Sequence, residues 1–180
     1  MSPAGKTQRG NSRAVLHSTL LVVGEGADDQ AFVSHMKQLF CPRGCGLSVK
    51  VESGDGGSAG NIITNAIRSY RDSGHDKRLL LLDADLPPTA QERKRAEQAG
   101  YAVILWAPQS LEGALLDALG EAVQAHETSQ QLKQRLHPRL ATRHTEAAAY
   151  AVLFTLDRLQ STHNLALSQL RRALLNQPAE

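Results

Sequence analysis

Four short apolar segments separated by helical stretches dominate the first two thirds of the chain. Thr19–Val23 (TLLVV), Leu79–Leu82 (LLLL) and Tyr101–Trp106 (YAVILW) are apolar runs without regular polar alternation. Such runs are typical of central strands in a parallel sheet, because both faces of those strands are buried. Leu47–Glu52 (LSVKVE) alternates apolar and polar residues, which predicts a half-exposed strand at or near a sheet edge.

Apolar residues at helical spacing follow each of these predicted strands. The expected helices cover Asp28 to about Phe40, Asn61–Tyr70, Thr89–Ala99 and a segment through Leu115 and Leu119. The order of elements is therefore βαβαβαβα, which predicts an α/β fold with a four-stranded, mainly parallel sheet and right-handed crossovers.

The strand signals stop after residue 119. We predict three helices there, over Glu121–Leu136, Thr145–Gln160 and Ser161–Leu175, with the apolar middle helix (AAAYAVLFTL) buried. Ser161 or Thr162 is the expected N-cap of the last helix. Three regions follow from the whole pattern: a flexible basic arm over residues 1–18, a domain over residues 19–119, and a helical extension packed on it over residues 120–180.

Composition fits a soluble globular protein. The 180 residues are 41% apolar and 21% charged, and the formal net charge of +2 is too small to indicate nucleic acid binding by itself. No apolar run approaches the roughly 18 residues of a membrane span, and residues 1–18 lack the apolar centre of a signal peptide. We therefore expect no membrane association and a cytoplasmic protein, in which Cys41 and Cys45 are reduced thiols.

Acidic residues follow three of the predicted strands at the point where each ends. Glu25 follows the first strand, Asp83 and Asp85 follow the leucine run, and Glu112 follows the fourth strand. Because parallel strands of this unit end at one edge of the sheet, we expect these side chains to converge where open α/β folds bind ligands. Close carboxylates repel one another unless a cation neutralises them, and a divalent cation with oxygen ligands is the simplest candidate.

Several of these acids also have an ordinary structural explanation. Asp28, Asp29 and Glu112 stand in the first turn of a predicted helix, where a negative charge favours the helix dipole. Asp83 and Asp85 also fit a solvated turn and a helix N-cap. Glu25 is not explained in this way, because it lies between two glycines at a tight turn.

The acidic elements resemble those of a Toprim domain, the small α/β module of topoisomerases, primases and several nucleases. That module has a Glu after its first strand and an Asp-x-Asp after its third, matched here by Glu25 and by Asp83-Ala84-Asp85. The closer resemblance is to Toprim nucleases of the OLD (overcoming lysogenization defect) type and to RloB-like proteins. Their E-G-x-x-D and S-x-E elements are matched by Glu25, Gly26 and Asp29, and by Ser110-Leu111-Glu112. The resemblance covers about Thr19 to Leu119.

The resemblance implies a nuclease that hydrolyses phosphodiester bonds in DNA or RNA with Mg²⁺ or Mn²⁺. Glu25, Asp83 and Asp85 would be catalytic, the same three with Asp29 and Glu112 would hold one or two ions, and Ser110 would bind an ion or orient Glu112. OLD-type proteins join this domain to an ATPase, and the chain has no Walker A sequence, so the resemblance implies that the protein either works with a separate ATPase partner or acts alone. The family also uses a basic residue beyond the sheet, and the candidates for it are Lys133, Arg139, Arg143 and His144. The candidates for nucleic acid contact are Lys133, Arg135, Arg139, Arg143 and His144.

Two alternatives remain open from the sequence. A non-catalytic Toprim module would bind metal and a partner or nucleic acid without cleaving it. A receiver-like phosphoacceptor domain would use Asp28, Asp29 and Asp83, but that fold needs a fifth strand with a Lys, and the C-terminal part offers none. Homo-oligomers are compatible with either reading.

Overall fold

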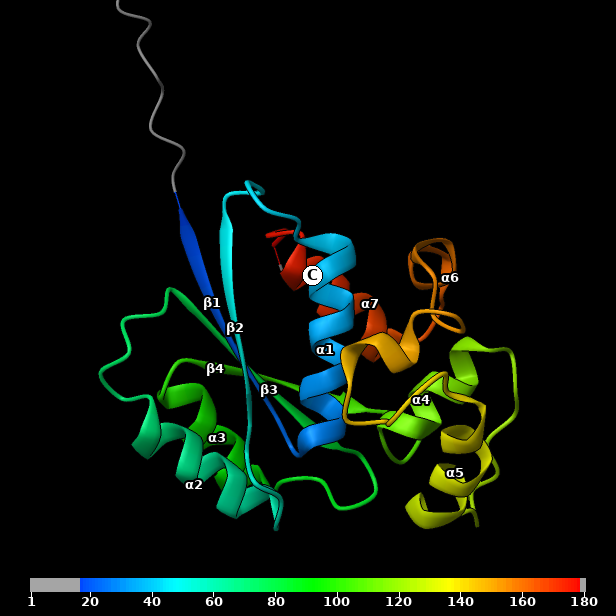
Figure 1. The fold of residues 1–180 in the computed structure, drawn as a ribbon. Coiled ribbons are helices and arrows are strands. Elements are labelled where there is room, and N and C mark those ends of the chain that lie inside the picture. The colour runs from blue at the N-terminus through cyan, green and yellow to red at the C-terminus, as the bar shows by residue number, and fades with distance from the viewer. Residues whose placement is uncertain (1–16, 179–180) are drawn as a thin grey trace, which may run out of the picture.

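The structure of the protein is a computed structural model that describes residues 17–178. Four parallel strands form one sheet in the order β2-β1-β3-β4 (Figure 1). The strands are β1 (Ser18–Gly24), β2 (Leu47–Ser53), β3 (Lys77–Asp83) and β4 (Tyr101–Trp106). The predicted α/β class and parallel sheet are confirmed, as are the edge position of β2 and the central position of β3. Residues 1–16 of the predicted basic arm lie outside the described residues.

The leucines of β3 are buried on both faces of the sheet. Leu79, Leu80, Leu81 and Leu82 are each at most 8% exposed. Successive side chains of a strand point to opposite faces, so Leu80 and Leu82 join one apolar core while Leu79 and Leu81 join another. This double burial is why the segment contains no polar residue before Asp83.

Helices cover both faces of the sheet (Figure 1). The helices α2 (Ala59–Ser69) and α3 (Ala90–Gln98) lie on one face, and α1 (Ala27–Phe40) and α7 (Leu165–Leu174) lie on the other. The α3 helix starts at a capping box, in which the Thr89 backbone amide donates to Glu92 Oε2 at 2.8 Å and the Glu92 amide donates to Thr89 Oγ1 at 3.2 Å. It buries only Ala96, as expected for an exposed, charged helix.

The C-terminal part differs from the prediction of three long helices, which was wrong. The elements after β4 are α4 (Leu111–Ala118), α5 (Ser129–Leu136), the 3₁₀ turns η1 (His137–Arg139) and η2 (Ala147–Tyr150), α6 (Leu156–Ser161) and α7. Residues 121–128 form a loop instead of the first half of a helix. The N-cap of the last helix is Asn164, whose side chain accepts from the Leu167 backbone amide at 3.2 Å, and not Ser161 or Thr162.

The apolar segment predicted as one buried helix is interrupted because only some of its side chains reach the core. Tyr150 and Phe154 pack edge-on against Phe32, with ring centroids 5.3 and 5.9 Å apart. Val152 lies between them and is 71% exposed. The segment therefore anchors to α1 through two aromatic rings, and it shares one apolar core with the sheet, α1, α5 and α7. No helix within residues 17–178 combines the length and apolar character needed to cross a membrane.

Candidate metal centre

A pocket of about 270 Å³ opens at the carboxyl edge of the sheet, and acids dominate its lining. The ends of β1 and β3, the loop after β2 and the first turns of α1 and α4 all reach it, together with one residue of α5. The lining residues are Glu25, Gly26, Ala27, Asp28, Asp29, Gly56, Asp83, Leu111, Glu112 and Lys133. The structure thus brings together Glu25, Asp29, Asp83 and Glu112, while Asp85 does not line the pocket.

A hydrogen bond links Glu25 and Asp83 at the carboxyl ends of the neighbouring strands β1 and β3. The Asp83 backbone amide donates to Glu25 Oε2 at 2.9 Å, and the Leu111 amide donates to Asp83 Oδ1 at 3.2 Å. Within residues 17–178, no hydrogen bond occupies Glu25 Oε1 or Asp83 Oδ2. Each carboxylate therefore keeps one oxygen for a ligand while the other fixes its orientation.

Asp29 lines the same pocket and is buried. It is 6% exposed, and it accepts from Trp106 Nε1 at 2.6 Å and from the Gly26 backbone amide at 3.1 Å. A Cβ atom on Gly24 would overlap the Asp29 side chain, so the glycine at the end of β1 permits this close approach. Both oxygens of Asp29 accept hydrogen bonds from the protein, so Asp29 is better suited to stabilise a bound ion through its charge than to coordinate it.

Glu112 is held by two side chains. It is 3% exposed; Ser110 Oγ donates to Oε2 at 3.1 Å, and His137 Nε2 lies 3.1 Å from Oε1. Burial acts to raise the pKa of Glu112, but the hydrogen bond from His137 and the charge of Lys133 outweigh it, so the pKa lies below its usual value. Ser110 therefore orients Glu112, which is one of the two roles expected for it.

Asp85 lies outside the pocket and is exposed. The Leu86 backbone amide donates to its Oδ1 at 2.8 Å, and Ser129 Oγ donates to its Oδ2 at 2.7 Å. The contact with Ser129 joins the loop after β3 to the first residue of α5. Asp85 still adds to the negative potential of the site, because its charge contributes to raising the pKa of Glu25 and Asp83.

Three acids of the pocket, Asp83, Asp29 and Glu25, have raised pKa values. Burial first, and then the charges of Glu25, Asp29 and Glu112, raise the pKa of Asp83 to about 8. Burial raises the pKa of Asp29 to about 7, against the lowering effect of its donors, and also raises the pKa of Glu25. A cation placed among these groups would offset the repulsion between the carboxylates, which adds to the effect of burial on these pKa values.

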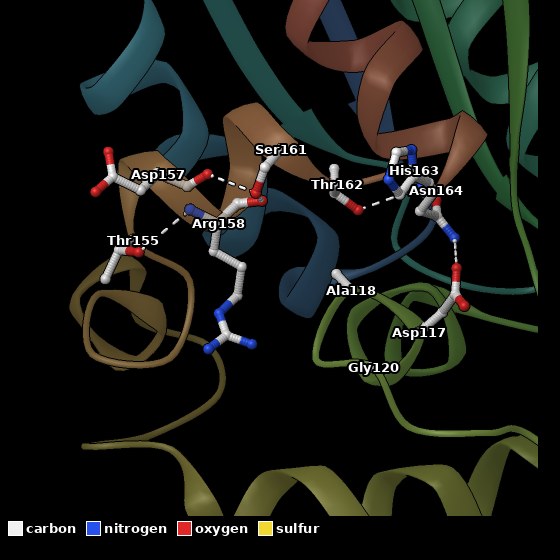
Figure 2. A pocket seen from close by; sticks show the side chains of 10 residues that line it. All are labelled: Asp117, Ala118, Gly120, Thr155, Asp157, Arg158, Ser161, Thr162, His163 and Asn164. Atoms are coloured by element: carbon white, nitrogen blue, oxygen red, sulfur yellow. Dashed lines mark hydrogen bonds between the residues drawn. The ribbon is translucent and has the colours of Figure 1, made fainter.

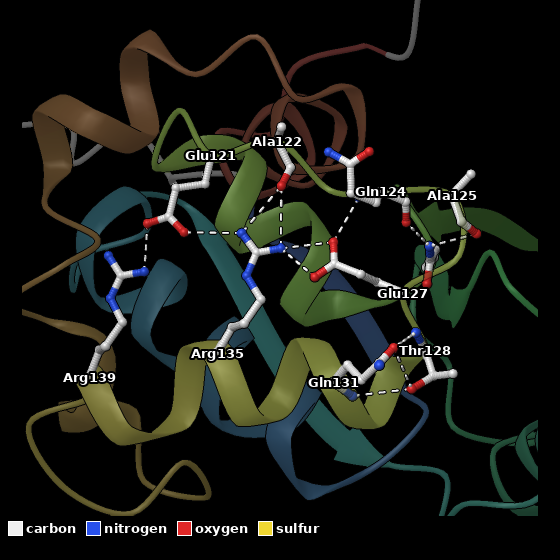
Figure 3. Close-up of polar contacts among 10 residues, drawn as sticks. Glu121, Ala122, Gln124, Ala125, Glu127, Thr128, Gln131, Arg135 and Arg139 are labelled. Carbon is white, nitrogen blue, oxygen red and sulfur yellow. Dashed lines mark hydrogen bonds and ion pairs between the residues drawn. The ribbon is translucent and has the colours of Figure 1, made fainter.

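The predicted basic residues divide into two groups. Lys133 lines the pocket, with its Nζ 3.8 Å from Asp28 Oδ2. Arg135 instead binds Glu127 at 2.7 and 2.9 Å and Glu121 at 3.2 Å, as Figure 3 shows. Arg139 binds the other oxygen of Glu121 at 2.6 Å. These two arginines fasten the loop of residues 121–128 to α5, and Arg143 is exposed.

The sequence analysis did not predict one group of possible metal ligands at this site. Asp28, His137 and His144 each offer one ligand atom, and these atoms all lie within 4.8 Å of one another. Asp28 comes from the first turn of α1, His137 from the end of α5, and His144 from the loop before η2. These side chains are suited to hold a metal ion. The only sequence signal was the His-rich basic stretch after α5.

A larger pocket of about 580 Å³ lies elsewhere, between α4, α6 and the start of α7 (Figure 2). Several of its polar side chains form hydrogen bonds with backbone groups. Thr155 and Asn164 are the N-caps of α6 and α7, and Asn164 also donates to Asp117 Oδ2 and to the Ala107 carbonyl, each at 2.8 Å. It gathers no carboxylate cluster, so the smaller pocket is the better candidate site.

Searches of family models, curated proteins and solved structures found no match to the chain. The resemblance to Toprim nucleases stays a prediction, and the functional argument depends on the geometry of the site.

Proposed function

We propose that the protein is a divalent-metal-dependent nuclease of the Toprim type, which hydrolyses phosphodiester bonds with Mg²⁺ or Mn²⁺. The observation that supports this most is that Glu25 and Asp83 line one acidic pocket and that each has one carboxylate oxygen without a hydrogen bond in residues 17–178. Ligand sets made of carboxylate oxygens suit these hard cations.

The residues that would hold such an ion line one pocket. Glu25 and Asp83 would hold it directly, with their second oxygens already fixed by backbone amides. Asp29 and Glu112 would stabilise it from behind through their charge, since their oxygens have protein donors. When bound, the metal would supply an activated water and stabilise the leaving oxygen.

Lys133 is the best candidate for the basic residue that the family uses. Its ammonium group lies at the mouth of the pocket beside Asp28, and its side chain is 42% exposed. It can therefore meet a phosphate group from solvent and offset its charge. Arg135 and Arg139 already neutralise Glu121 and Glu127 and are less suited to this role.

A partner that supplies ATPase activity fits the proposal, because the OLD-type nucleases that the sequence resembles join the two domains. The receiver-like alternative is less favoured, since the sheet in residues 17–178 has four strands and that fold needs a fifth with a lysine. The non-catalytic Toprim module is the remaining rival, and it differs in having no cleavage activity.

A cleavage assay tests the proposal. Single- and double-stranded DNA and RNA are incubated with the protein and Mg²⁺, Mn²⁺ or EDTA. We expect metal-dependent cleavage that Asp83→Ala abolishes and Lys133→Ala strongly reduces, because the first loses a ligand and the second a phosphate-neutralising charge.

The matched controls are exposed residues of the same type on other elements, Asp72→Ala and Lys94→Ala, and both should retain wild-type activity. Retained cleavage in Asp83→Ala would refute the nuclease assignment. Metal binding without cleavage of any substrate would instead support the non-catalytic module.

A further inference from the structure

We propose that Asp28, His137 and His144 form a second metal site, selective for a Zn²⁺-class ion and separate from the carboxylate pair of Glu25 and Asp83. The three ligand atoms lie within 4.8 Å of one another, which is close enough to share one ion after small side-chain rotations. The site is half-buried, with side-chain exposures of 17% for Asp28, 20% for His137 and 42% for His144.

The two imidazole rings lie face to face. Their centroids are 4.2 Å apart and their planes differ by 11°. His144 Nδ1 also forms a hydrogen bond with Asp28 Oδ1 at 2.5 Å, so two of the three ligand groups already meet at one point. A neutral ring nitrogen is the form of histidine that binds metals.

Glu112 determines which nitrogen of His137 is free. An ionised carboxylate can only accept hydrogen bonds, so the 3.1 Å contact requires the proton to be on His137 Nε2. In the neutral form of this ring, Nδ1 is then the nitrogen with the lone pair. A carboxylate that accepts from the distal nitrogen is the usual partner of a metal-binding histidine, because it fixes the tautomer and the ring orientation. Ser110 in turn fixes Glu112.

The donor set selects the metal. Two imidazole nitrogens and one carboxylate oxygen suit Zn²⁺ and neighbouring transition metals, whereas Mg²⁺ prefers oxygen donors and retains water. Three protein ligands leave a tetrahedral ion one open position. The exposure of His144 leaves that position accessible to solvent.

The other candidate zinc ligands are elsewhere in the fold. Cys41 is the C-cap of α1, at the end of the helix opposite Asp28, and its Sγ contacts that of Cys45. His35 is buried and its Nε2 bonds the Phe154 carbonyl at 2.7 Å. Cys45 and Asp83 variants therefore separate this site from the thiol pair and from the carboxylate pocket.

Zinc affinity of the full chain, measured by competition with a chromophoric chelator, tests the proposal, together with the visible spectrum of the Co²⁺ form. We expect one tight equivalent with a spectrum typical of nitrogen and oxygen ligands, undiminished by millimolar Mg²⁺. His137→Ala and His144→Ala should lose it, and Glu112→Gln should weaken it by about 10- to 100-fold, as loss of an orienting carboxylate does.

His163→Ala, Cys45→Ser and Asp83→Asn should each keep the equivalent. His163 is the matched control because it is an exposed histidine on the other pocket. Thermal melts check that every variant folds, and His144→Gln replaces the alanine variant if that one does not. Wild-type zinc affinity in the His144 variant would overturn the proposal, as would loss of the equivalent in Asp83→Asn or Cys45→Ser.

Discussion

At the scale of single residues, the proposed metal site depends on the free carboxylate oxygens of Glu25 and Asp83 more than on the number of acids nearby. Asp29 and Glu112 use both of their oxygens within the protein, and Asp85 uses its oxygens to join β3 to α5. Glu25 and Asp83 line the pocket, and each keeps one oxygen without a hydrogen bond in residues 17–178. The five acids that look equivalent in the sequence therefore have different positions in the site.

The raised pKa of Asp83 predicts that the metal-free protein loses stability as the pH rises. Its pKa moves from 3.8 to about 8 on folding, so between these values the folded protein binds more protons than the unfolded chain. The free energy of unfolding then falls with rising pH in this range. Urea denaturation in EDTA between pH 5 and 8 should show the decline.

Asp83→Asn should make this decline shallower and should be more stable than wild type at pH 8. The asparagine oxygen can still accept from the Leu111 amide, so the cap is kept while the charge is removed. Glu112, with its lowered pKa, acts with the opposite sign, but only as the pH falls below about 4.5. An unchanged slope in the variant would show that Asp83 is already ionised at low pH.

The sequence revealed some of these residues and concealed others for a physical reason. Glu25 and Asp83 could be predicted because they follow apolar strands directly, and strand ends converge in a parallel sheet. Asp28 had a sufficient explanation in the helix dipole, and His137 looked like part of a solvated basic stretch. Their contact with the site depends on how α5 packs, which local spacing does not encode.

At the scale of elements, the strands were predictable and the helices after residue 119 were not. The leucine run of β3 and the alternation in β2 report burial by the sheet itself. The loop of residues 121–128 depends on Arg135, which lies on a different element and pairs with Glu121 and Glu127. The break near Val152 depends on Phe32, more than a hundred residues earlier.

The ion pairs of Arg135 with Glu121 and Glu127, called the Arg135 clamp here, predict a measurable contribution of Arg135 to stability. Arg135→Ala should modestly lower the melting temperature, because it removes the charge partner of Glu127 and donors to the Ala122 carbonyl. The loss should be smaller in 1 M salt, since salt screens exposed ion pairs. Arg143→Ala, an exposed arginine in the next loop, is the control. Equal melting temperatures for the two variants would mean that the loop keeps its position without the clamp.

At the scale of the whole molecule, the sheet brings acids from distant parts of the chain to one edge, and the C-terminal elements complete the site. Lys133 comes from α5, and His137 and His144 follow it. Residues 120–178 are therefore part of the candidate site as well as of its apolar core. Nuclease activity and metal selectivity are expected to require this part of the chain.

The central claim is that Asp83 holds a divalent cation, and thermal melts of wild type and Asp83→Asn with and without Mg²⁺ test it most directly. At a Mg²⁺ concentration about 100 times its dissociation constant, the wild type should gain about 2.7 kcal/mol, or roughly 5 to 11 °C. Asp83→Asn should melt at the same or a higher temperature than the metal-free wild type and should lose this Mg²⁺ response, while Asp72→Asn keeps it. An Asp83→Asn protein that is less stable without metal, and responds to Mg²⁺ as the wild type does, would show that Asp83 only caps α4 and would contradict the account.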